Sequence, residues 1–342
     1  HAQIIDSLFA IAIFLVIFIQ LIVVSKNLNY YVNVRHLAPT MQFALDNWNK
    51  ISKKLQVIYE NLNTHKIEKE PFNEQLVYSP LPRAYQWLDA SAYVNHVSLV
   101  RKARGAEMPQ SFWKDPLMYQ GGSDDFISPR SPILLSSENW GIDMEAEIAI
   151  ITNDVEMGCG IKEAKDKILL LMLVNDVSLR NLVPSELAKG FGFIQSKPST
   201  SFSPVAVTID EIKPFWEKGK LHRNIHVNLN DKPIGRANAG MDMTFSFYDL
   251  IVHASKSRNL RSGSIIGSGT ISNKSLNGDP GKPIEKGGKG YSCIAELRMV
   301  EKIQLGNPKT SFMRFGDKVS IDMFDENKQS IFGKIEQIVQ KK

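Results

Sequence analysis

Cysteine is scarce in this sequence, and the two residues present form no metal-binding pattern. Among 342 residues only Cys159 and Cys293 occur, and they make neither a CxxC pair nor a Cys/His zinc pattern. Nothing in their spacing indicates a disulfide, so a reducing compartment is favoured. We therefore expect a cytoplasmic protein.

Clustered charge and internal repeats are also missing. The net charge of +5 is spread out, with short pairs such as Lys53-Lys54 in place of a basic stripe, and aromatic residues do not recur at regular spacing. These absences exclude a nucleic-acid-binding protein. A mild basic excess suits an anionic small molecule, although it is equally typical of an ordinary surface.

One long apolar run stands at the N-terminus. Residues 8–24 contain Gln20 as their only strongly polar member, and these seventeen residues reach the lower edge of a membrane span. No charged region precedes the run as in a signal peptide, and Lys26 and Arg35 follow it, which would place the rest of the chain on the cytoplasmic side. The alternatives are membrane contact through residues 8–24 and a buried strand or helix, so the role of residues 1–20 stays open.

The remaining pattern predicts two parts. A short apolar strand and a helix with Met41, Ala44, Leu45 and Trp48 at helical spacing precede the polar, proline-bearing stretch 65–82. We therefore predict a small N-terminal domain with its linker over 21–80 and a large domain over 81–342, a division that the chain length allows.

Strands outnumber helices in the large domain. Helices are predicted at 89–104 and 161–168. Strands are predicted at 144–152, 169–174, 203–208, 224–229, 264–266, 293–300, 318–324 and 330–339. Because strands and helices do not alternate regularly, the pattern favours an α+β domain built on a folded mixed sheet.

Acidic residues occur at several places where a strand could present them to one site. Glu145 and Glu147 share a face of a predicted strand whose other face is apolar, and Asp176 follows the apolar run 168–174. Paired buried carboxylates repel each other unless a cation lies between them, and oxygen ligands favour Mg²⁺, Ca²⁺ or Mn²⁺. Alternatively, the pair lies on a solvent-facing edge strand and Asp176 caps a helix.

Three further features are weak when taken singly. Asp89 and His96 are separated by two helical turns, which would place a carboxylate beside an imidazole base, although such a pair is more often surface or core. A glycine-bearing loop ends at Lys197. The segment Gly267-Ser-Gly-Thr270 follows a predicted strand, and its small residues allow close approach of a ligand. Both stretches also resemble ordinary surface loops and turns.

Together and in this order, these residues resemble the fumarylacetoacetate hydrolase family. The similarity runs from about Trp87 to the C-terminus and is strongest around DMEAEIA, NDVSLRNL, KGFGFIQSKPSTSFSP and GSGTIS. Residues 23–48 resemble the small N-terminal domain of bacterial members, whereas the first twenty residues do not. The resemblance implies a mixed β-sandwich roll with a small N-terminal domain, and a homodimer.

The resemblance also assigns roles to individual residues. Asp89, Glu145, Glu147 and Asp176 would bind Mg²⁺ or Ca²⁺, with Mn²⁺ a further candidate. His96 would activate water with Glu296 as its orienting partner, and Arg180 and Lys197 would hold the oxyanion. Tyr119, Thr270 and Arg104 would bind the substrate, with Arg101 and Lys102 as alternatives to Arg104. The family's oxyanion-hole glutamine falls near Val183, which leaves that part of the hole unassigned.

The implied reaction is hydrolysis of a small anionic β-diketo acid, with fumarylacetoacetate split into fumarate and acetoacetate during tyrosine and phenylalanine catabolism. The alternatives are an acylpyruvate hydrolase, an oxaloacetate decarboxylase, and a membrane-tethered binding protein without activity. A decarboxylase needs no water-activating pair, so His96 and Glu296 favour hydrolysis.

Overall fold

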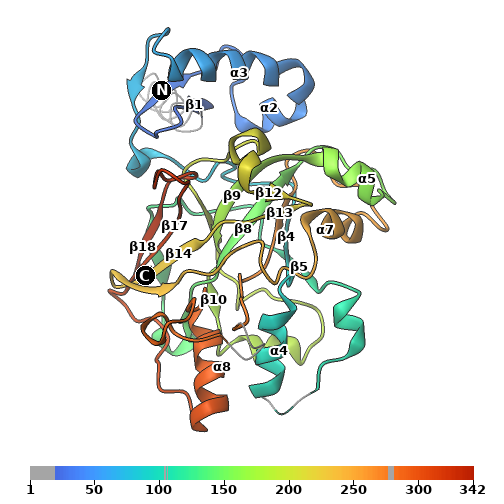
Figure 1. Cartoon of the computed structure of the whole chain (residues 1–342), viewed down its shortest axis with the longest axis vertical. Coiled ribbons are helices and arrows are strands. Elements are labelled where there is room, and N and C mark those ends of the chain that lie inside the picture. Colours follow the sequence, from blue (N-terminus) through green and yellow to red (C-terminus); the bar gives the residue numbers. More distant parts are fainter. Residues whose placement is uncertain (1–19, 104, 106, 276–280) are drawn as a thin grey trace, which may run out of the picture.

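The computed structural model describes residues 20–103, 105, 107–275 and 281–342. Figure 1 shows a small N-terminal module at the top, a β-rich body below it, and helices α4 (Val94–Ala103) and α8 (Ile294–Leu305) at the opposite end. Most of the apolar run at 8–24 lies outside the described residues, and its last part forms strand β1 (Ile22–Val24). Within the described ranges no helix is long and apolar enough to cross a membrane.

The N-terminal module is a small sheet covered by two helices. Strand β1 pairs with β2 (Tyr30–Asn33), which pairs with β3 (Glu70–Pro71), and helices α2 (Met41–Asp46) and α3 (Trp48–Asn63) follow β2. The Thr40 hydroxyl caps α2 by accepting a hydrogen bond from the Phe43 N–H. The predicted strand and helices of this part are confirmed, with a break between the helices at Asn47.

A six-stranded mixed sheet carries most of the buried surface of the body. Its order is β11 (Ser201–Phe202), β9 (Ile168–Asn175), β8 (Ala146–Thr152), β16 (Ile265–Gly267), β4 (Trp87–Ala90) and β5 (Met118–Gly121). Only the β16–β4 pair is parallel, and the others are antiparallel. Every residue of β8 and β9 is buried, which explains their nearly continuous apolar sequences.

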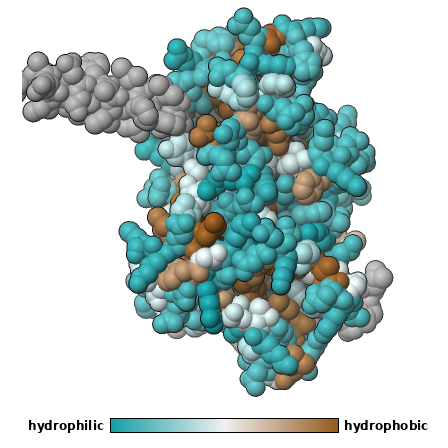
Figure 2. All heavy atoms as spheres, turned by 90° about the vertical axis from the view of Figure 1, so that its left-hand side faces the viewer, coloured by the Kyte–Doolittle hydropathy of each residue, from teal (hydrophilic) through white to brown (hydrophobic). Residues whose placement is uncertain are grey.

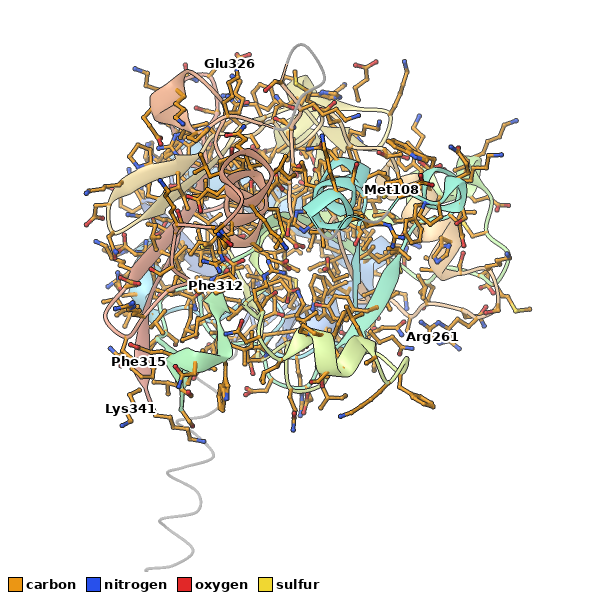
Figure 3. The ribbon with its side chains drawn as sticks, turned by 90° about the horizontal axis from the view of Figure 1, so that it is seen from below. Met108, Arg261, Phe312, Phe315, Glu326 and Lys341 are labelled. Atoms are coloured by element: carbon orange, nitrogen blue, oxygen red, sulfur yellow. The ribbon has the colours of Figure 1, made fainter. Side chains whose placement is uncertain are left out.

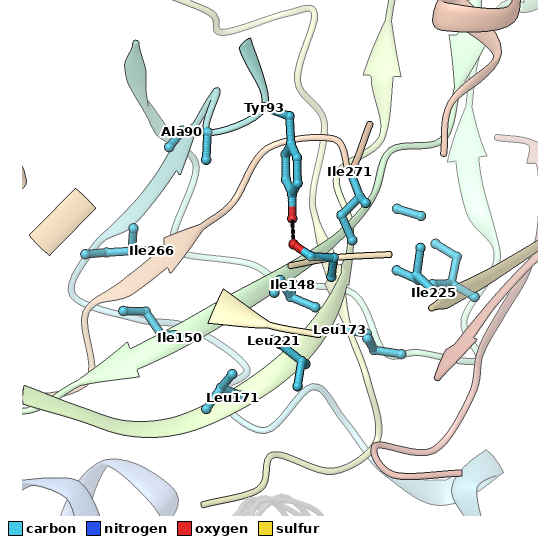
Figure 4. Packing of buried hydrophobic residues seen from close by; sticks show 14 of the residues in the cluster. Ala90, Tyr93, Ile148, Ile150, Leu171, Leu173, Leu221, Ile225, Ile266 and Ile271 are labelled. Atoms are coloured by element: carbon cyan, nitrogen blue, oxygen red, sulfur yellow. Dashed lines mark hydrogen bonds between the residues drawn. The ribbon is translucent and has the colours of Figure 1, made fainter. Parts of the chain in front are cut away.

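A five-stranded sheet packs against one face of the first. Its order is β15 (Lys232–Gly235), β14 (Ile225–Leu229), β17 (Lys318–Met323), β18 (Ile335–Lys341) and β6 (Ile133–Leu135). Side chains of both sheets form one apolar cluster, part of which is shown in Figure 4. The predicted α+β, mixed β-sandwich roll is confirmed.

The opposite face of the six-stranded sheet meets the N-terminal module. Strand alternation places Ala149 and Ile151 on this face, where they share an apolar cluster with Leu45 of α2. The Gln42 side chain donates to the Ser262 carbonyl at 2.8 Å, and the Ser262 hydroxyl donates to the Leu45 carbonyl at 3.0 Å. These contacts fix the module on the sheet.

Short elements complete the body. Two-stranded ladders join β7 (Ile142–Asp143) to β10 (Ser178–Leu179) and β12 (Trp216–Glu217) to β13 (Lys220–Leu221). The other α-helices among the described residues are α5 (Ile161–Ala164), α6 (Val183–Leu187) and α7 (Phe247–Ala254). Helix α5 continues as a 3-10 turn over Lys165–Lys167, so the predicted helix at 161–168 is confirmed. The face drawn in Figure 2 is mainly hydrophilic, with apolar residues scattered over it.

Two predicted elements need correction. The helix predicted over 89–104 is confirmed as α4 from Val94 to Ala103, but its predicted start is wrong, because the buried residues Trp87–Ala90 form strand β4 and pair with strands on both sides. The strand predicted at 293–300 is the start of α8, in which Cys293 is the N-cap and Ile294 and Val300 are buried. Helix α8 packs against α4, as the view from below in Figure 3 also shows.

One further predicted strand does not form, and another is shorter than predicted. The stretch 203–208 contributes only an isolated bridge between Val207 and Leu171, since the sheet pairing of this segment occurs earlier, in β11. In the last predicted strand, Gly333 adopts a φ of +73°, so regular pairing begins only at Ile335.

Candidate functional site

Four carboxylates meet at one end of the six-stranded sheet. Asp89 lies in β4 and Glu147 in β8, while Glu145 directly precedes β8 and Asp176 directly follows β9. One oxygen of each lies within 4.8 Å of the others, and all four side chains are buried. The structure thus brings together the four residues that the sequence proposes as metal ligands.

A glycine makes room for this cluster. Gly267 of β16 is the Cα partner of Asp89 on one side and of Ala149 on the other. A Cβ atom at this position would lie 2.5 Å from Oδ1 of Asp89 and 2.4 Å from Cη2 of Trp87. A side chain here would therefore displace the Asp89 carboxylate.

The Glu147 carboxyl group is buried and receives no hydrogen bond from the described residues. It is 0% exposed, and neither carboxylate oxygen has a hydrogen-bond partner in the described part of the chain. Burial, followed by the charges of Asp89, Glu145 and Asp176, raises the pKa of Glu147 well above its usual range. Burial and the Asp176 charge also raise the pKa of Asp89 well above its usual range. Such a group requires either a proton or a cation.

Two basic side chains neutralise the other half of the cluster. The Lys197 ammonium donates to Oε2 of Glu145 at 2.7 Å and to Oδ2 of Asp176 at 2.6 Å. The Arg180 guanidinium donates to Oε1 of Glu145 at 2.7 Å. Burial opposes ionisation of Glu145, but these cations outweigh it and hold its pKa far below the ordinary value. Both predicted oxyanion donors are therefore at the site and bonded to carboxylates.

Two hydroxyl groups orient Asp176. The Tyr119 hydroxyl donates to Oδ2 at 2.6 Å, and the Thr200 hydroxyl donates to Oδ1 at 2.8 Å. Tyr119 belongs to β5, directly opposite Asp89 of β4. Burial and the Asp176 charge raise the pKa of Tyr119, so its phenol stays protonated and available as a donor.

A histidine–glutamate pair lies on the two helices at the same end of the molecule. Nδ1 of His96, on α4, is 2.9 Å from Oε2 of Glu296, on α8. The other oxygen of Glu296 accepts a hydrogen bond from the Ser272 hydroxyl at 2.8 Å, and Asn95 donates to that hydroxyl at 2.6 Å. Glu296 is 1% exposed, so a fixed carboxylate orients the imidazole ring.

Asp143 connects this pair to the acidic cluster. Its carboxylate accepts hydrogen bonds from the Ile294 N–H at 2.7 Å and the Ala295 N–H at 2.9 Å, at the first turn of α8. It also accepts from Nε of Arg180 at 2.9 Å. One buried carboxylate thereby positions both the helix that carries Glu296 and the guanidinium that holds Glu145.

The other predicted residues are less closely tied to the cluster. Thr270 is buried beside Gly269, whose N–H donates to Oδ1 of Asp89 at 3.2 Å. Val183 begins α6. Arg104 lies outside the described residues, so its predicted role in substrate binding stays a prediction.

Sequence reasoning missed Asp143, Thr200, Ser272 and Asn95. Each is adjacent to or within four residues of a residue that the sequence did single out. Asn95 and Ser272 are separated by 177 positions, and only the packing of α4 against the segment after β16 brings them together. No local sequence pattern predicts such a contact.

The donor set fits a hard divalent cation. The cluster offers carboxylate oxygens alone, and the unpartnered oxygens of Glu147 point to an additional positive charge at the site. Carboxylates of this kind suit Mg²⁺, Mn²⁺ or Ca²⁺ better than Zn²⁺.

Comparisons with known proteins agree with this arrangement. The family model described as fumarylacetoacetate (FAA) hydrolase C-terminal matches residues 86–340, and the model described as fumarylacetoacetase N-terminal domain 2 matches residues 20–83. The exact domain boundary at residue 80 stays a prediction.

The curated fumarylacetoacetases are distant relatives of which the matched region covers only part. Fumarylacetoacetase from Arabidopsis thaliana is 24% identical over 268 residues, which are 70% of this chain and 56% of the plant enzyme. Fumarylacetoacetase from Aspergillus fumigatus is 28% identical over 269 residues, which are 64% of this chain and 62% of the fungal enzyme. The chain thus spans little more than half the length of these relatives.

Solved structures share the fold. Maleylpyruvate hydrolase from Sphingobium sp. SYK-6, in complex with manganese(II) ion and pyruvate, superposes with a TM-score of 0.61 at 15% identity, covering 94% of this chain and 96% of that one. The 5-carboxymethyl-2-hydroxymuconate delta-isomerase from Mycobacterium smegmatis gives a TM-score of 0.50 at 17% identity, covering 77% and 79%. Because the family models cover most of the sequence, the chain belongs to the fumarylacetoacetate hydrolase family, whose members are enzymes that include hydrolases and isomerases.

Proposed function

We propose that this chain is a divalent-metal-dependent hydrolase that cleaves a carbon–carbon bond of a β-diketo acid, with fumarylacetoacetate as substrate and fumarate and acetoacetate as products. The observation that carries the proposal is the His96–Glu296 pair, 2.9 Å apart, at the same end of the molecule as four buried carboxylates. Such a pair is what water activation requires. The carboxylates Asp89, Glu145, Glu147 and Asp176 would hold the cation, for which we propose Mg²⁺ or Ca²⁺, with Mn²⁺ also suitable.

The cation would bind the diketo oxygens and polarise the carbonyl under attack. His96 accepts a proton from water through the ring nitrogen that does not face Glu296, while the Glu296 carboxylate stabilises the imidazolium. The hydroxide adds to the carbonyl carbon, the adjacent carbon–carbon bond breaks, and the imidazolium proton passes to the departing carbon. One water molecule is consumed and two carboxylic acids leave.

Arg180 and Lys197 stabilise the negative charge that develops on the carbonyl oxygen. Lys197 has three N–H donors, of which two bond Glu145 and Asp176, so one is left for substrate. Charge-assisted donors fixed in a buried site are effective because they need no reorganisation during the reaction. Tyr119 and Thr270 would bind the carboxylate ends of the substrate, together with a basic residue near Arg104. For this the Tyr119 hydroxyl, which has one hydrogen, would turn from Asp176 to the substrate.

The proposal is tested by a spectrophotometric assay with fumarylacetoacetate and an acylpyruvate side by side, with Mg²⁺ and with chelator. Chelator-sensitive loss of diketone absorbance with fumarylacetoacetate supports the proposal. Loss of absorbance with the acylpyruvate alone would support the same mechanism with an acylpyruvate as the substrate. If neither reacts while metal binds, release of CO₂ from oxaloacetate tests the decarboxylase alternative.

Two accompanying proposals concern the whole protein. We propose a homodimer, which light scattering of the purified protein tests. We also propose a cytoplasmic location, which fractionation of cells expressing the chain tests, with recovery in the membrane fraction as the contrary result.

A further inference from the structure

A second group of metal-binding side chains lies beside the four carboxylates. His96, Cys293 and Glu296 each offer one ligand atom, and these three atoms lie within 4.8 Å of one another. Cys293 is the N-cap of α8, and its sulfur accepts a hydrogen bond from the Glu296 N–H at 3.4 Å. The packing of α4 against α8 brings His96 to this point, some 200 residues away along the chain.

The chemistry of this second group differs from that of the first. An imidazole nitrogen, a sulfur and one carboxylate form the kind of mixed set that Zn²⁺ prefers, whereas Mg²⁺ and Ca²⁺ favour oxygen alone. Three protein ligands are enough for a zinc site whose fourth position is taken by water. The two groups therefore select different cations although they lie close together.

The charges around Cys293 act in both directions: those of Asp143 and Glu296 favour an added cation, and that of Arg180 opposes it. Burial, and then the charge of Asp143, raise the pKa of the Cys293 thiol well above its ordinary value. The thiol is thus neutral in the metal-free protein and packs as a small core side chain. Zinc binding would release its proton to solvent. The His96 side chain is partly exposed, so an ion would reach the group from the side of His96.

We propose that His96, Cys293 and Glu296 form a second, inhibitory site that binds Zn²⁺. Zinc at this site engages the imidazole and the carboxylate that would otherwise activate water, so turnover stops although Mg²⁺ stays bound to the four carboxylates. The inhibition rests on the proposed hydrolase function, whereas zinc binding itself does not.

The first experiment measures binding without activity. The full chain is saturated with Mg²⁺ and titrated with Co²⁺ as a spectroscopic substitute for Zn²⁺, and the thiolate-to-cobalt charge-transfer absorbance is recorded. We expect one equivalent of Co²⁺ to produce this band and Zn²⁺ to remove it by competition. Cys293→Ser should lack the band and keep its fold, because serine is a common N-cap residue. Cys159→Ser is the matched control, since Cys159 is the other buried cysteine and lies outside the group.

Two outcomes would overturn the proposal. One is that the wild-type protein shows no thiolate band, and the other is that the band persists in Cys293→Ser. If that variant does not fold, X-ray absorption of zinc-loaded Cys159→Ser decides the matter. One sulfur ligand at about 2.3 Å is expected, and a shell of nitrogen and oxygen alone refutes the site.

The second experiment measures turnover at saturating Mg²⁺. Zn²⁺ should inhibit the wild-type protein and Cys159→Ser equally, and Cys293→Ser should need at least about tenfold more Zn²⁺ for the same inhibition, because it loses one of three ligands. Equal inhibition of Cys293→Ser would mean that zinc acts at the four carboxylates instead. If the protein does not turn over the substrate at all, the hydrolase proposal fails while the cobalt band still tests the zinc site.

Discussion

Replacing Glu147 by glutamine should have opposite effects in the absence and presence of metal. The substitution keeps the shape of the side chain and removes its charge. In the structure this charge is buried, has no hydrogen-bond partner in the described chain, and lies beside three other carboxylates. Without metal, Glu147→Gln should therefore stabilise the protein, whereas with metal it should remove a ligand.

The magnitudes follow from these contacts. The glutamine amide can donate to the neighbouring carboxylates, and a hydrogen bond to a charged group contributes about 1.5–3 kcal/mol, so chelated Glu147→Gln should gain about that much over the chelated wild type at neutral pH. A cation at a hundred times its Kd stabilises the wild type by about 2.7 kcal/mol, and the variant should lose most of this increment. For a chain of 342 residues the increment corresponds to a Tm change of about 4 °C.

The sign of the pH dependence provides an internal check. Because burial and neighbouring charges raise the folded-state pKa of Glu147, its contribution to stability is present at low pH and is lost as pH rises through that pKa. The advantage of Glu147→Gln in chelator should therefore shrink as pH falls from 8 to 5.

Thermal unfolding of both proteins, with Mg²⁺ and with chelator, tests the reasoning. The exposed residue Glu68 supplies the control, since Glu68→Gln should leave the wild-type unfolding temperatures with Mg²⁺ and with chelator unchanged. If Glu147→Gln lowers the stability of the chelated protein and keeps the full metal-induced shift, Glu147 is not a ligand and the assigned cluster is wrong.

Three other perturbations address different parts of the structure. His96→Gln should lower kcat by about 10²–10⁴-fold and leave Mn²⁺ binding, measured by calorimetry, within a few-fold of wild type; undiminished turnover would remove His96 as the base. Gly267→Ala should weaken Mn²⁺ binding and destabilise the protein by about 1–3 kcal/mol in urea, because the new Cβ would lie 2.5 Å from Oδ1 of Asp89; wild-type affinity would contradict the close contact. Burial raises the pKa of Asp322 to about 6, so this carboxylate lowers the stability of the fold as pH rises from about 4 to 6. In urea titrations Asp322→Asn should therefore gain up to about 3 kcal/mol of unfolding free energy at pH 7 and little at pH 4. An equal gain at both pH values would exclude this cause.

Local sequence determined the elements whose burial is uniform. Residues 168–174 are all apolar, and the strand they form is buried on both faces. Strand alternation also predicted Glu145 and Glu147 on one side, and both reach the acidic cluster although Glu145 lies one residue before β8. The helix that begins at Met41 also followed from helical spacing.

Local sequence was misleading where tertiary contacts decide. The interval from Asp89 to His96 matches two helical turns, yet Asp89 belongs to a strand because β16 and β5 pair with both of its edges. Similarly, the short stretch that starts at Cys293 is too brief to distinguish a strand from a helix by its apolar pattern, and packing against α4 selects the helix.

The sequence by itself determined which residue types could perform chemistry here: carboxylates for a hard cation, one histidine with a distant glutamate, and two basic side chains. Only the tertiary structure decided that Asp143 links α8 to Arg180, and that Cys293 stands beside His96. The reason is physical: hydrogen bonds and metal ligation act over about 3 Å, and for residues 150 to 200 positions apart only the packing of sheets and helices sets such distances.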